Sequence, residues 1–517
     1  MTHSILVTVE TLAFFSLSYL AGDLAFRLTG LEPSQTRIRW VYAVMLGMGV
    51  FAVIGVILGI TGSFTPLHLH LLMLTVLAAS WRTARLLIQR LYHREYSAAA
   101  VAQAVAPHFR EYPIFKFFIL LWLAVNFTLA FVPITAHDTK AYHLPVILDL
   151  RDHGRLSFSR DVFEYGWAAL TGETLYAIPT TAFFAAVAPF AFQIIQYSLL
   201  PLLLLVIYEF LRARVRHPLL PIAAVIMILG IMDLQREALH GGYTDLFVFL
   251  FGIASALLIV DVPWRDRRRL NDVALSAVFL GVALAVKLTA GFVAITNGIF
   301  LLAGMIRDRI GAKKAAAYLA AYGLIVFAIS SFWYVKNAVV WGNPFYIGGL
   351  MFAETIVAER TLLNMLLFPF LKFGSIARGD SSSELIVLGY FILAYAAGIA
   401  ALLAARKKIT LTHILLFVFT QLQIMLIFFR THHTRYMLSA LIMLPVLLAI
   451  IADTVCQWLA AHRHPATYRR ILRASEVCLA VVLVVFFIGN IRYFYVKVLY
   501  KTGVLNELEY IKKIGSQ

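Results

Sequence analysis

Residues 113–155 read PIFKFFILLWLAVNFTLAFVPITAHDTKAYHLPVILDLRDHGR, an apolar run followed at once by a dense polar segment. Residues 113–132 are long enough for one bilayer-spanning helix, which needs ~20 mostly apolar residues. Residues 133–155 then gather His, Asp, Lys, Tyr and Arg side chains in a chain of which only 14% is charged. The stretch predicts a membrane span followed by a functional loop, with Asp138 as its first candidate residue.

The rest of the composition follows the same pattern. The 517 residues are 61% hydrophobic, with a mean hydropathy of +0.84, more apolar than soluble globular domains are. The apolar runs are continuous rather than alternating, which excludes a transmembrane β-barrel. We expect an all-α polytopic membrane protein with about 13–14 transmembrane helices. The candidate spans are residues 5–26, 40–61, 68–90, 113–132, 193–211, 219–233, 243–262, 272–286, 289–306, 316–334, 384–404, 411–428, 436–455 and 475–491.

The net charge of +17 is explained by topology rather than by nucleic acid. The basic residues cluster between apolar runs, for example at 27–39, 82–94, 212–216, 265–269, 307–314, 406–408 and 463–473, as the positive-inside rule predicts for cytoplasmic loops. Alternate crossing then places 62–67, 133–192, 234–242, 287–288, 335–383, 430–435 and the tail after Arg492 on the far side. Cys456 and Cys478 lie at ends of predicted spans and indicate no disulfide scaffold.

Four regions follow from this topology. Residues 1–112 hold N-terminal transmembrane helices of unknown role, and 113–334 a transmembrane module that carries the first long far-side loop, 133–192. Residues 335–383 form a second far-side loop, and 384–517 hold C-terminal helices and a tail. Both loops mix aromatic and charged residues, which is typical of interfacial helices. Residues 176–192, interrupted by Pro179 and Pro189, are expected to form an interfacial or re-entrant helix.

The predicted far side collects the unusual polar residues, and ionisable groups at membrane depth point to a site. Asp138 can serve as a general base for a hydroxyl or amine acceptor. Cations predicted on the same side, Lys140, Lys287, Arg430 and Arg435, can bind a phosphate and stabilise it as a leaving group. A far-side enzyme has no access to cytosolic nucleotide sugars, so its donor would be a lipid-linked sugar.

Five segments in order resemble the GT-C class of polyprenyl-phosphate-sugar-dependent glycosyltransferases, in the branch of protein O-mannosyltransferases and the aminoarabinose transferase of lipid A. They are AHDTKAYHLPVILDLRDHG, GGYTDLFVFLF, AVKLTAGF, WYVKNAVVWGNPFY and HTRYMLSALIMLP, and they span roughly residues 130–450. The resemblance implies a GT-C-like fold with a catalytic first far-side loop.

The resemblance also implies roles for individual residues. Asp138 would deprotonate the acceptor, and Asp245 would be a second acidic residue near the acceptor or a metal. The remaining substrate-binding residues would be Lys140, Tyr142 and His143 in the first loop and Lys287, His433, Arg435 and Tyr436 further along. Two features depart from the family pattern. About four spans precede the Asp138 loop where the class usually has one. Position 137 is His where some relatives carry a second acidic residue.

The sequence requires no cofactor, and a divalent metal stays an open alternative, because the spacing of His137, His143 and His153 matches no single helical face. Simpler roles also compete at several positions. Asp138 and Asp245 suit helix N-caps, Lys287 could snorkel at a turn, and Arg435 could anchor a helix end.

The function expected from the sequence is an inverting integral-membrane glycosyltransferase in a bacterial inner or plasma membrane, with Asp138 as general base and its active site facing the periplasm or another extracytoplasmic space. Its partners would be a polyprenyl-phosphate sugar donor, an envelope glycan, lipid or protein acceptor, and the bilayer, with no nucleic acid. The alternatives are a transporter or flippase for a lipid-linked saccharide, and an O-antigen ligase or polymerase. Charges near mid-membrane on several helices would favour transport. Arginines and a His in a large late loop would favour a ligase or polymerase.

Overall fold

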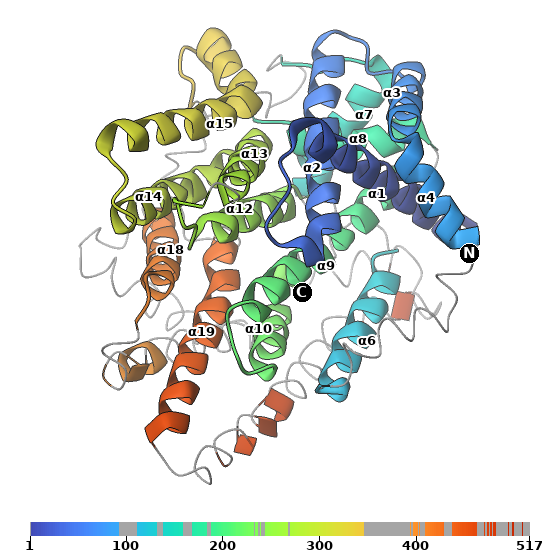
Figure 1. Ribbon diagram of the computed structural model, residues 1–517. Coiled ribbons are helices and arrows are strands. Elements are labelled where there is room, and N and C mark those ends of the chain that lie inside the picture. The colour runs from blue at the N-terminus through green and yellow to red at the C-terminus, as the bar shows by residue number, and fades with distance from the viewer. Residues whose placement is uncertain are drawn as a thin grey trace. The chain divides into compact units, whose positions relative to one another are not determined.

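The computed structural model describes residues 2–92, 111–131, 138–158, 168–183, 188–231, 233–235, 243–266, 269–345, 409–428 and 437–462, with isolated positions elsewhere. The regular structure of these residues is helical, and they contain no strand, which confirms the predicted all-α class (Figure 1). The chain divides into two compact units. Residues 1–205, 238–291 and 301–348 form unit 1, and residues 206–237, 292–300 and 349–517 form unit 2.

Unit 1 holds the N-terminal helices and most of the predicted catalytic module. Its elements are α1 (Thr2–Thr29), η1 (Thr36–Ile38), α2 (Arg39–Ile60), α3 (Pro66–Ala79), α4 (Trp81–Tyr92), α6 (Pro113–Leu129), η2 (Thr139–His143), α7 (Leu144–His153), α8 (Thr171–Ala182), α12 (Asp245–Ile259), α13 (Leu270–Val286), η5 (Leu288–Ala290) and α15 (Ala312–Trp341). The unit boundaries divide α9 (Ala188–Arg212) and α14 (Gly291–Arg307), whose other parts belong to unit 2.

Unit 2 also holds α10 (Leu219–Leu229), α18 (Leu411–Phe428) and α19 (Leu438–His462), and α19 packs against both α10 and α18. The carboxylate of Asp453 on α19 accepts hydrogen bonds from the backbone N–H groups of Arg216 (2.9 Å) and His217 (3.2 Å). These bonds fix α19 to the connection between α9 and α10.

Within the described residues, six helical segments are long and apolar enough to cross a membrane: Ser4–Thr29, Thr36–Ile60, Phe192–Arg212, Leu288–Arg307, Ala312–Trp341 and Leu438–Ala461. Shorter apolar helices of 10–17 residues coincide with the predicted spans 113–132, 219–233, 243–262, 272–286 and 411–428. The chain is therefore a multi-pass membrane protein. The predicted spans 384–404 and 475–491 and the segment 346–383 lie largely outside the described residues.

The predicted span 68–90 is not a straight helix, because α3 and α4, which together are long and apolar enough to cross a membrane, meet at a bend of 74°. Ser80 lies at the bend, and its hydroxyl donates a hydrogen bond to the carbonyl of Leu20 (3.1 Å). Thr83, at the start of α4, donates to Asp23 Oδ2 (2.8 Å). These two contacts with α1 hold the bend, which apolar periodicity alone does not predict.

The helix expected within 176–192 is divided between two helices, because residues 176–182 lie in α8 and residues 188–192 begin α9. Every residue of α8 is buried inside the protein, including Glu173 and Thr174. The choice between an interfacial and a re-entrant helix stays a prediction. The other expected interfacial segments, around Phe163 to Trp167 and Leu362 to Phe373, lie outside the described residues.

Helices α1 and α2 of unit 1 approach each other closely at two glycines. A Cβ on Gly22 would lie 1.7 Å from the Ala43 carbonyl oxygen, and one on Gly47 would lie 1.7 Å from that of Ser18. Only glycine lets two backbones approach this closely, as in many membrane helix pairs. The crossing fixes the antiparallel register of the N-terminal helix pair.

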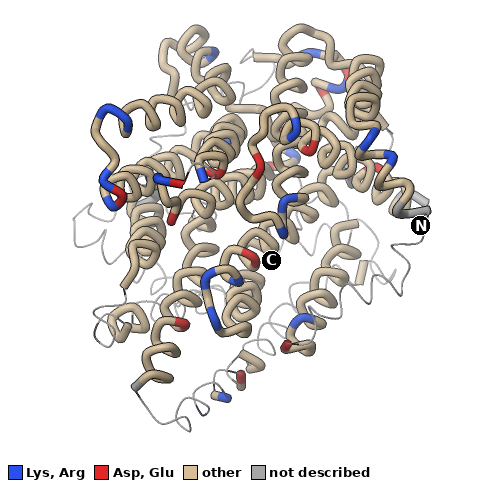
Figure 2. The backbone as a smooth tube through the Cα atoms, in the orientation of Figure 1, with Lys and Arg blue, Asp and Glu red and all other residues tan. Residues whose placement is uncertain are grey.

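Loops predicted to share the cytoplasm meet at one end of the unit 1 helices, which we call the basic end. There the carboxylate of Asp272, on the first turn of α13, accepts from the backbone N–H of Ser34 (2.9 Å). Arg307 donates to Asp261 Oδ1 (2.6 Å) after α12, and Arg39 pairs with Glu32 (2.6 Å). Figure 2 shows the charged residues gathered mainly at helix ends and connections.

Loops predicted to lie on the far side meet at the opposite helix ends, which we call the site end. The backbone N–H of Leu156 donates to the carbonyl of Gly59 (2.9 Å), at the end of α2. Trp333, near the end of α15, donates its indole N–H to Thr171 Oγ1 (2.7 Å). The sorting of loops in unit 1 thus agrees with the sorting predicted from charge.

Candidate functional site

The predicted first-loop residues lie on a short π-helix, η2, which runs directly into α7. The Leu144 N–H donates to the carbonyl of Thr139, the i to i+5 bond of a π-turn. Such turns are rare in proteins, and many of those that are found lie at functional sites. Asp138 precedes the helix with helical backbone angles, and its side chain makes no capping hydrogen bond. The simple role of Asp138 as an N-cap is therefore not realised.

Gly154 ends α7 and connects the helix to a neighbouring loop by a hydrogen bond. Gly154 has φ +68°, a left-handed conformation that glycine adopts without the steric cost paid by other residues. Its carbonyl accepts a hydrogen bond from the Phe64 N–H (2.9 Å). This contact anchors the helix that follows η2 to the loop between α2 and α3.

A buried pair joins η2 to α8. His143 Nδ1 and Glu173 Oε1 lie 2.6 Å apart, and the two side chains are only 2% and 3% exposed. His143 Nε2 and Glu173 Oε2 are also buried, and neither has a hydrogen-bond partner among the described residues. The pair therefore uses only part of its hydrogen-bonding capacity. An unsatisfied buried polar group in a native protein calls for an explanation, such as a catalytic role or a bound water or ion.

Aromatic rings surround this pair. The Tyr142 ring lies 4.1 Å from the His143 ring, and the Tyr243 ring meets His143 edge to face at 6.0 Å. The Tyr176 hydroxyl lies 2.7 Å from Gln196 Oε1 and 2.9 Å from the Tyr243 carbonyl oxygen, so it can donate to one of them at a time. These contacts fix the segment before α12 against α8 and α9.

An ion pair links the start of α12 to the end of α13. Lys287 Nζ donates to both carboxylate oxygens of Asp245 at 2.8 Å. The Asp245 side chain is 2% exposed and that of Lys287 is 22% exposed. Asp245 lies in the first turn of α12 and Lys287 directly follows α13, positions where helix dipoles favour their charges. Asp245 therefore holds the side chain of Lys287 in place. The backbone of Lys287 is extended where it leaves α13.

Gly172 brings the two pairs close together. A Cβ at this position would lie 2.4 Å from Thr244 Cγ2 and 3.3 Å from Val286 Cγ1. Each of these three residues immediately precedes one member of the pairs, namely Glu173, Asp245 and Lys287. The absence of a side chain on Gly172 therefore lets α8, α12 and α13 converge at the site end (Figure 1).

A second ammonium group lies at the same end, on α15. Lys336 is buried, its Nζ lies 3.4 Å from the carbonyl of Ala168, and it lies over the rings of Phe158 (5.6 Å) and Trp333 (5.3 Å). The indole of Trp333 is fixed by its hydrogen bond to Thr171. Aromatic faces stabilise a cation where solvent cannot.

The site combines predicted residues with residues that sequence reasoning missed. The structure gathers Tyr142, His143, Asp245 and Lys287, with the exposed Lys140 on the π-helix and Asp138 directly before it. Glu173 and Lys336 were missed. Each is the sole charged residue of an apolar stretch, 168–183 and 315–341 respectively, and that isolation is the signal that could have found them. His137, His433, Arg435 and Tyr436 lie outside the described residues.

Metal dependence stays open, and the described residues contain no cluster of three or more His, Cys, Asp or Glu side chains that could hold a metal ion. The described arrangement offers the Asp138 carboxylate before a π-helix, a buried His–Glu pair, the Asp245–Lys287 ion pair and the ammonium groups of Lys140 and Lys336. Such a set can bind an anionic group and accept a proton. No protein-family model, curated protein or solved structure matches the chain.

Proposed function

We propose that this protein is an integral-membrane glycosyltransferase of GT-C type, with about 13–14 spans. It would transfer a sugar from a polyprenyl-phosphate donor to an envelope glycan, lipid or protein on the non-cytoplasmic face of a bacterial inner or plasma membrane. The observation that carries the proposal is a convergence in unit 1. Four segments with the family resemblance, spread from Asp138 to Lys336, meet around the N-terminus of α8.

In the proposed reaction, Asp138 takes the proton of the acceptor hydroxyl or amine as the acceptor attacks the anomeric carbon of the donor sugar. The bond between that carbon and the phosphate oxygen breaks, and the polyprenyl phosphate leaves with the bonding electrons. Attack opposite the leaving group inverts the anomeric centre. Lys287 and Lys336 would offset the charge that develops on the phosphate.

The buried pairs would hold this arrangement in place. Asp245 fixes the ammonium of Lys287, and Glu173 fixes His143 one turn beyond Asp138. Because positioning within about 0.5 Å matters for catalysis, both pairs would support residues that contact substrate. The proposed location of the site on the non-cytoplasmic side is supported by the basic loops at the opposite end of the unit 1 helices, since basic loops favour the cytoplasm.

The proposal is tested by Asp138→Asn, with Asp152→Asn as the matched control in the same loop. Asp152 is a carboxylate with a 53% exposed side chain that pairs only with its neighbour Arg151 (2.7 Å) among the bonds of the described residues. Cells that carry each variant would be compared by mass spectrometry of their envelope glycans. We expect Asp138→Asn to remove the product mass seen with the wild-type gene and Asp152→Asn to keep it. A product unchanged in the Asp138→Asn strain, with equal membrane levels of protein, would overturn the assignment.

One observation favours the transport alternative. Glu10 lies inside the α1 span, is buried, and has no hydrogen-bond partner for either carboxylate oxygen among the described residues. Ionisable groups inside spans often mark transport pathways. Transport of a fluorescent lipid-linked saccharide by proteoliposomes, abolished by Glu10→Gln and kept by Asp138→Asn, would support this function instead.

A further inference from the structure

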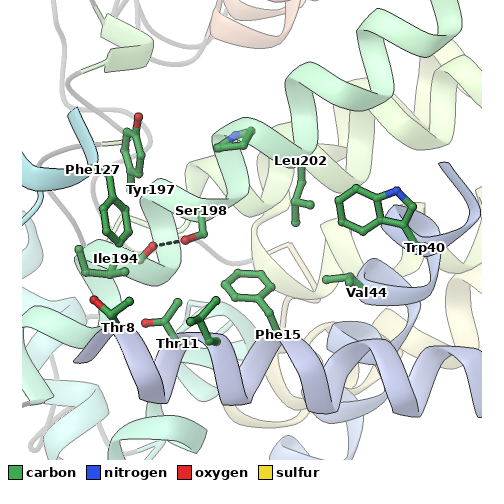
Figure 3. A pocket seen from close by; sticks show the side chains of 12 residues that line it. Thr8, Thr11, Phe15, Trp40, Val44, Phe127, Ile194, Tyr197, Ser198 and Leu202 are labelled. Atoms are coloured by element: carbon green, nitrogen blue, oxygen red, sulfur yellow. Dashed lines mark hydrogen bonds between the residues drawn. The ribbon is translucent and has the colours of Figure 1, made fainter. Parts of the chain in front are cut away.

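A groove of about 270 Å³ lies in unit 1 between α1, α2, α6 and α9. Its walls come mainly from large apolar side chains, among them Phe15, Trp40, Val44, Phe127, Tyr197 and Leu202 (Figure 3). On α9 it extends from Ile194 to Leu202, a length of about 12 Å at ~1.5 Å per helical residue. An engineered apolar cavity of about 150 Å³ holds benzene, so this groove has room for a longer hydrocarbon.

Three of the hydroxyl groups around the groove donate to backbone carbonyls, and that of Thr11 is buried without a hydrogen-bond partner among the described residues. Ser198 donates to Ile194 (2.7 Å), Thr8 donates to Ser4 (2.7 Å), and Tyr197 donates to Leu123 (2.7 Å). Figure 3 shows the bond between Ser198 and Ile194 along the groove wall. With these three donors occupied, the groove offers mainly hydrocarbon contacts to a ligand, which suits an acyl chain better than a sugar or a nucleotide.

The groove opens toward lipid. Leu12 on α1 and Trp40 on α2 line it and are 62% and 46% exposed, and both belong to segments long and apolar enough to span a membrane. Inside a bilayer such exposed side chains contact acyl chains rather than water. Acyl chains of the surrounding bilayer can therefore enter the groove.

One end of the groove lies near the basic end of unit 1. Trp40 directly follows Arg39, which is paired with Glu32 and Asp23 at that end. Trp is the side chain that favours the boundary between acyl chains and headgroups. Arg37, which is exposed, lies three residues before Trp40. A cation beside an interfacial Trp suits an anionic headgroup.

We propose that this groove binds one acyl chain of an anionic phospholipid from the leaflet at the basic end, with the headgroup phosphate at Arg37. The site is remote from the proposed catalytic residues, which lie at the site end, and the inference does not depend on the proposed function. It gives the N-terminal helices α1 and α2 a role as a lipid-binding element.

The test uses the full-length protein, purified, stripped of lipid and titrated with palmitoyl-oleoyl phosphatidylglycerol, followed by native mass spectrometry. Val44→Phe narrows the groove, and Val53→Phe is the matched control, because Val53 is 37% exposed on the same helix outside the groove. We expect Val44→Phe to weaken the first binding event at least fivefold and Val53→Phe to leave it unchanged. Leu12→Trp changes only the exposed mouth of the groove and should weaken the first binding event as well. This second variant keeps the test valid if Val44→Phe does not fold.

Two further binding measurements identify the headgroup and the hydrocarbon chain of the bound lipid. Arg37→Gln should remove the preference for phosphatidylglycerol over phosphatidylcholine while leaving chain binding intact. Unchanged binding in both Val44→Phe and Leu12→Trp would overturn the site. Displacement of phosphatidylglycerol by an equal concentration of undecaprenyl phosphate would overturn the phospholipid assignment and indicate a polyprenyl chain.

Discussion

The buried pair of His143 and Glu173 joins two segments that lie 30 positions apart in the sequence. His143→Ala would leave the Glu173 carboxyl buried without its 2.6 Å partner, and we expect a loss of about 3 kcal/mol of stability. Adding Glu173→Ala should recover part of that loss, giving a coupling energy of about 1–3 kcal/mol. The free energy of unfolding of each variant can be measured in mixed detergent micelles. Strictly additive losses would show that the two side chains do not interact.

At the same scale, the two ammonium groups differ in how they are held. Lys287 is held by a carboxylate, whereas Lys336 lies over aromatic rings with a backbone carbonyl 3.4 Å from its nitrogen. In the proposed reaction both ammonium groups would present positive charge to a phosphate.

At the scale of elements, the approach of α8 to α12 depends on Gly172. Gly172→Ala would place a Cβ 2.4 Å from Thr244 Cγ2, and we expect a loss of about 1–3 kcal/mol from the forced shift. Adding Thr244→Ser, which removes that methyl group, should restore part of the stability. Gly323→Ala on α15 is the control, because a Cβ there meets nothing within 4 Å, and it should be neutral or slightly stabilising. Equal effects at the two glycines would contradict this explanation.

The end of α14 makes stability dependent on pH through Asp308. The Arg307 guanidinium, which donates to Asp308 at 2.8 Å, lowers the pKa of that carboxyl, and the Trp264 N–H (2.7 Å) contributes in the same direction. A lowered pKa in the folded state stabilises the protein above the unfolded value of about 4, and the contribution is lost as the pH falls through the folded value.

Asp308→Asn should therefore lower the unfolding temperature at pH 7 and lose its effect progressively below about pH 4. The measurement is thermal unfolding in detergent at a series of pH values. A deficit of the same size at pH 3 and pH 7 would contradict the assignment of the effect to ionised Asp308.

At the scale of the whole molecule, the two ends of the unit 1 helices should face opposite compartments. Thr36 lies at the basic end and Arg155 at the site end, and both are exposed. After Cys456 and Cys478 are replaced by Ser, a membrane-impermeant maleimide applied to spheroplasts should label Arg155→Cys and spare Thr36→Cys. Labelling of Thr36→Cys alone would reverse the proposed orientation, and labelling of both would contradict the crossing of unit 1.

The membrane class, the approximate position of the described helices and the sorting of loops in unit 1 could be predicted from the sequence alone. These properties are local, because a span requires a continuous apolar run and a cytoplasmic loop requires nearby basic residues. The tertiary structure alone decided the bend at Ser80, the burial of α8, and the pairing of Glu173 with His143 and of Trp333 with Thr171, partners 30 and 162 positions apart. Such pairings depend on which helices can approach closely, as α8 and α12 do at Gly172. That approach is set by side-chain volumes contributed by distant segments, and no local pattern of apolar and charged residues contains it.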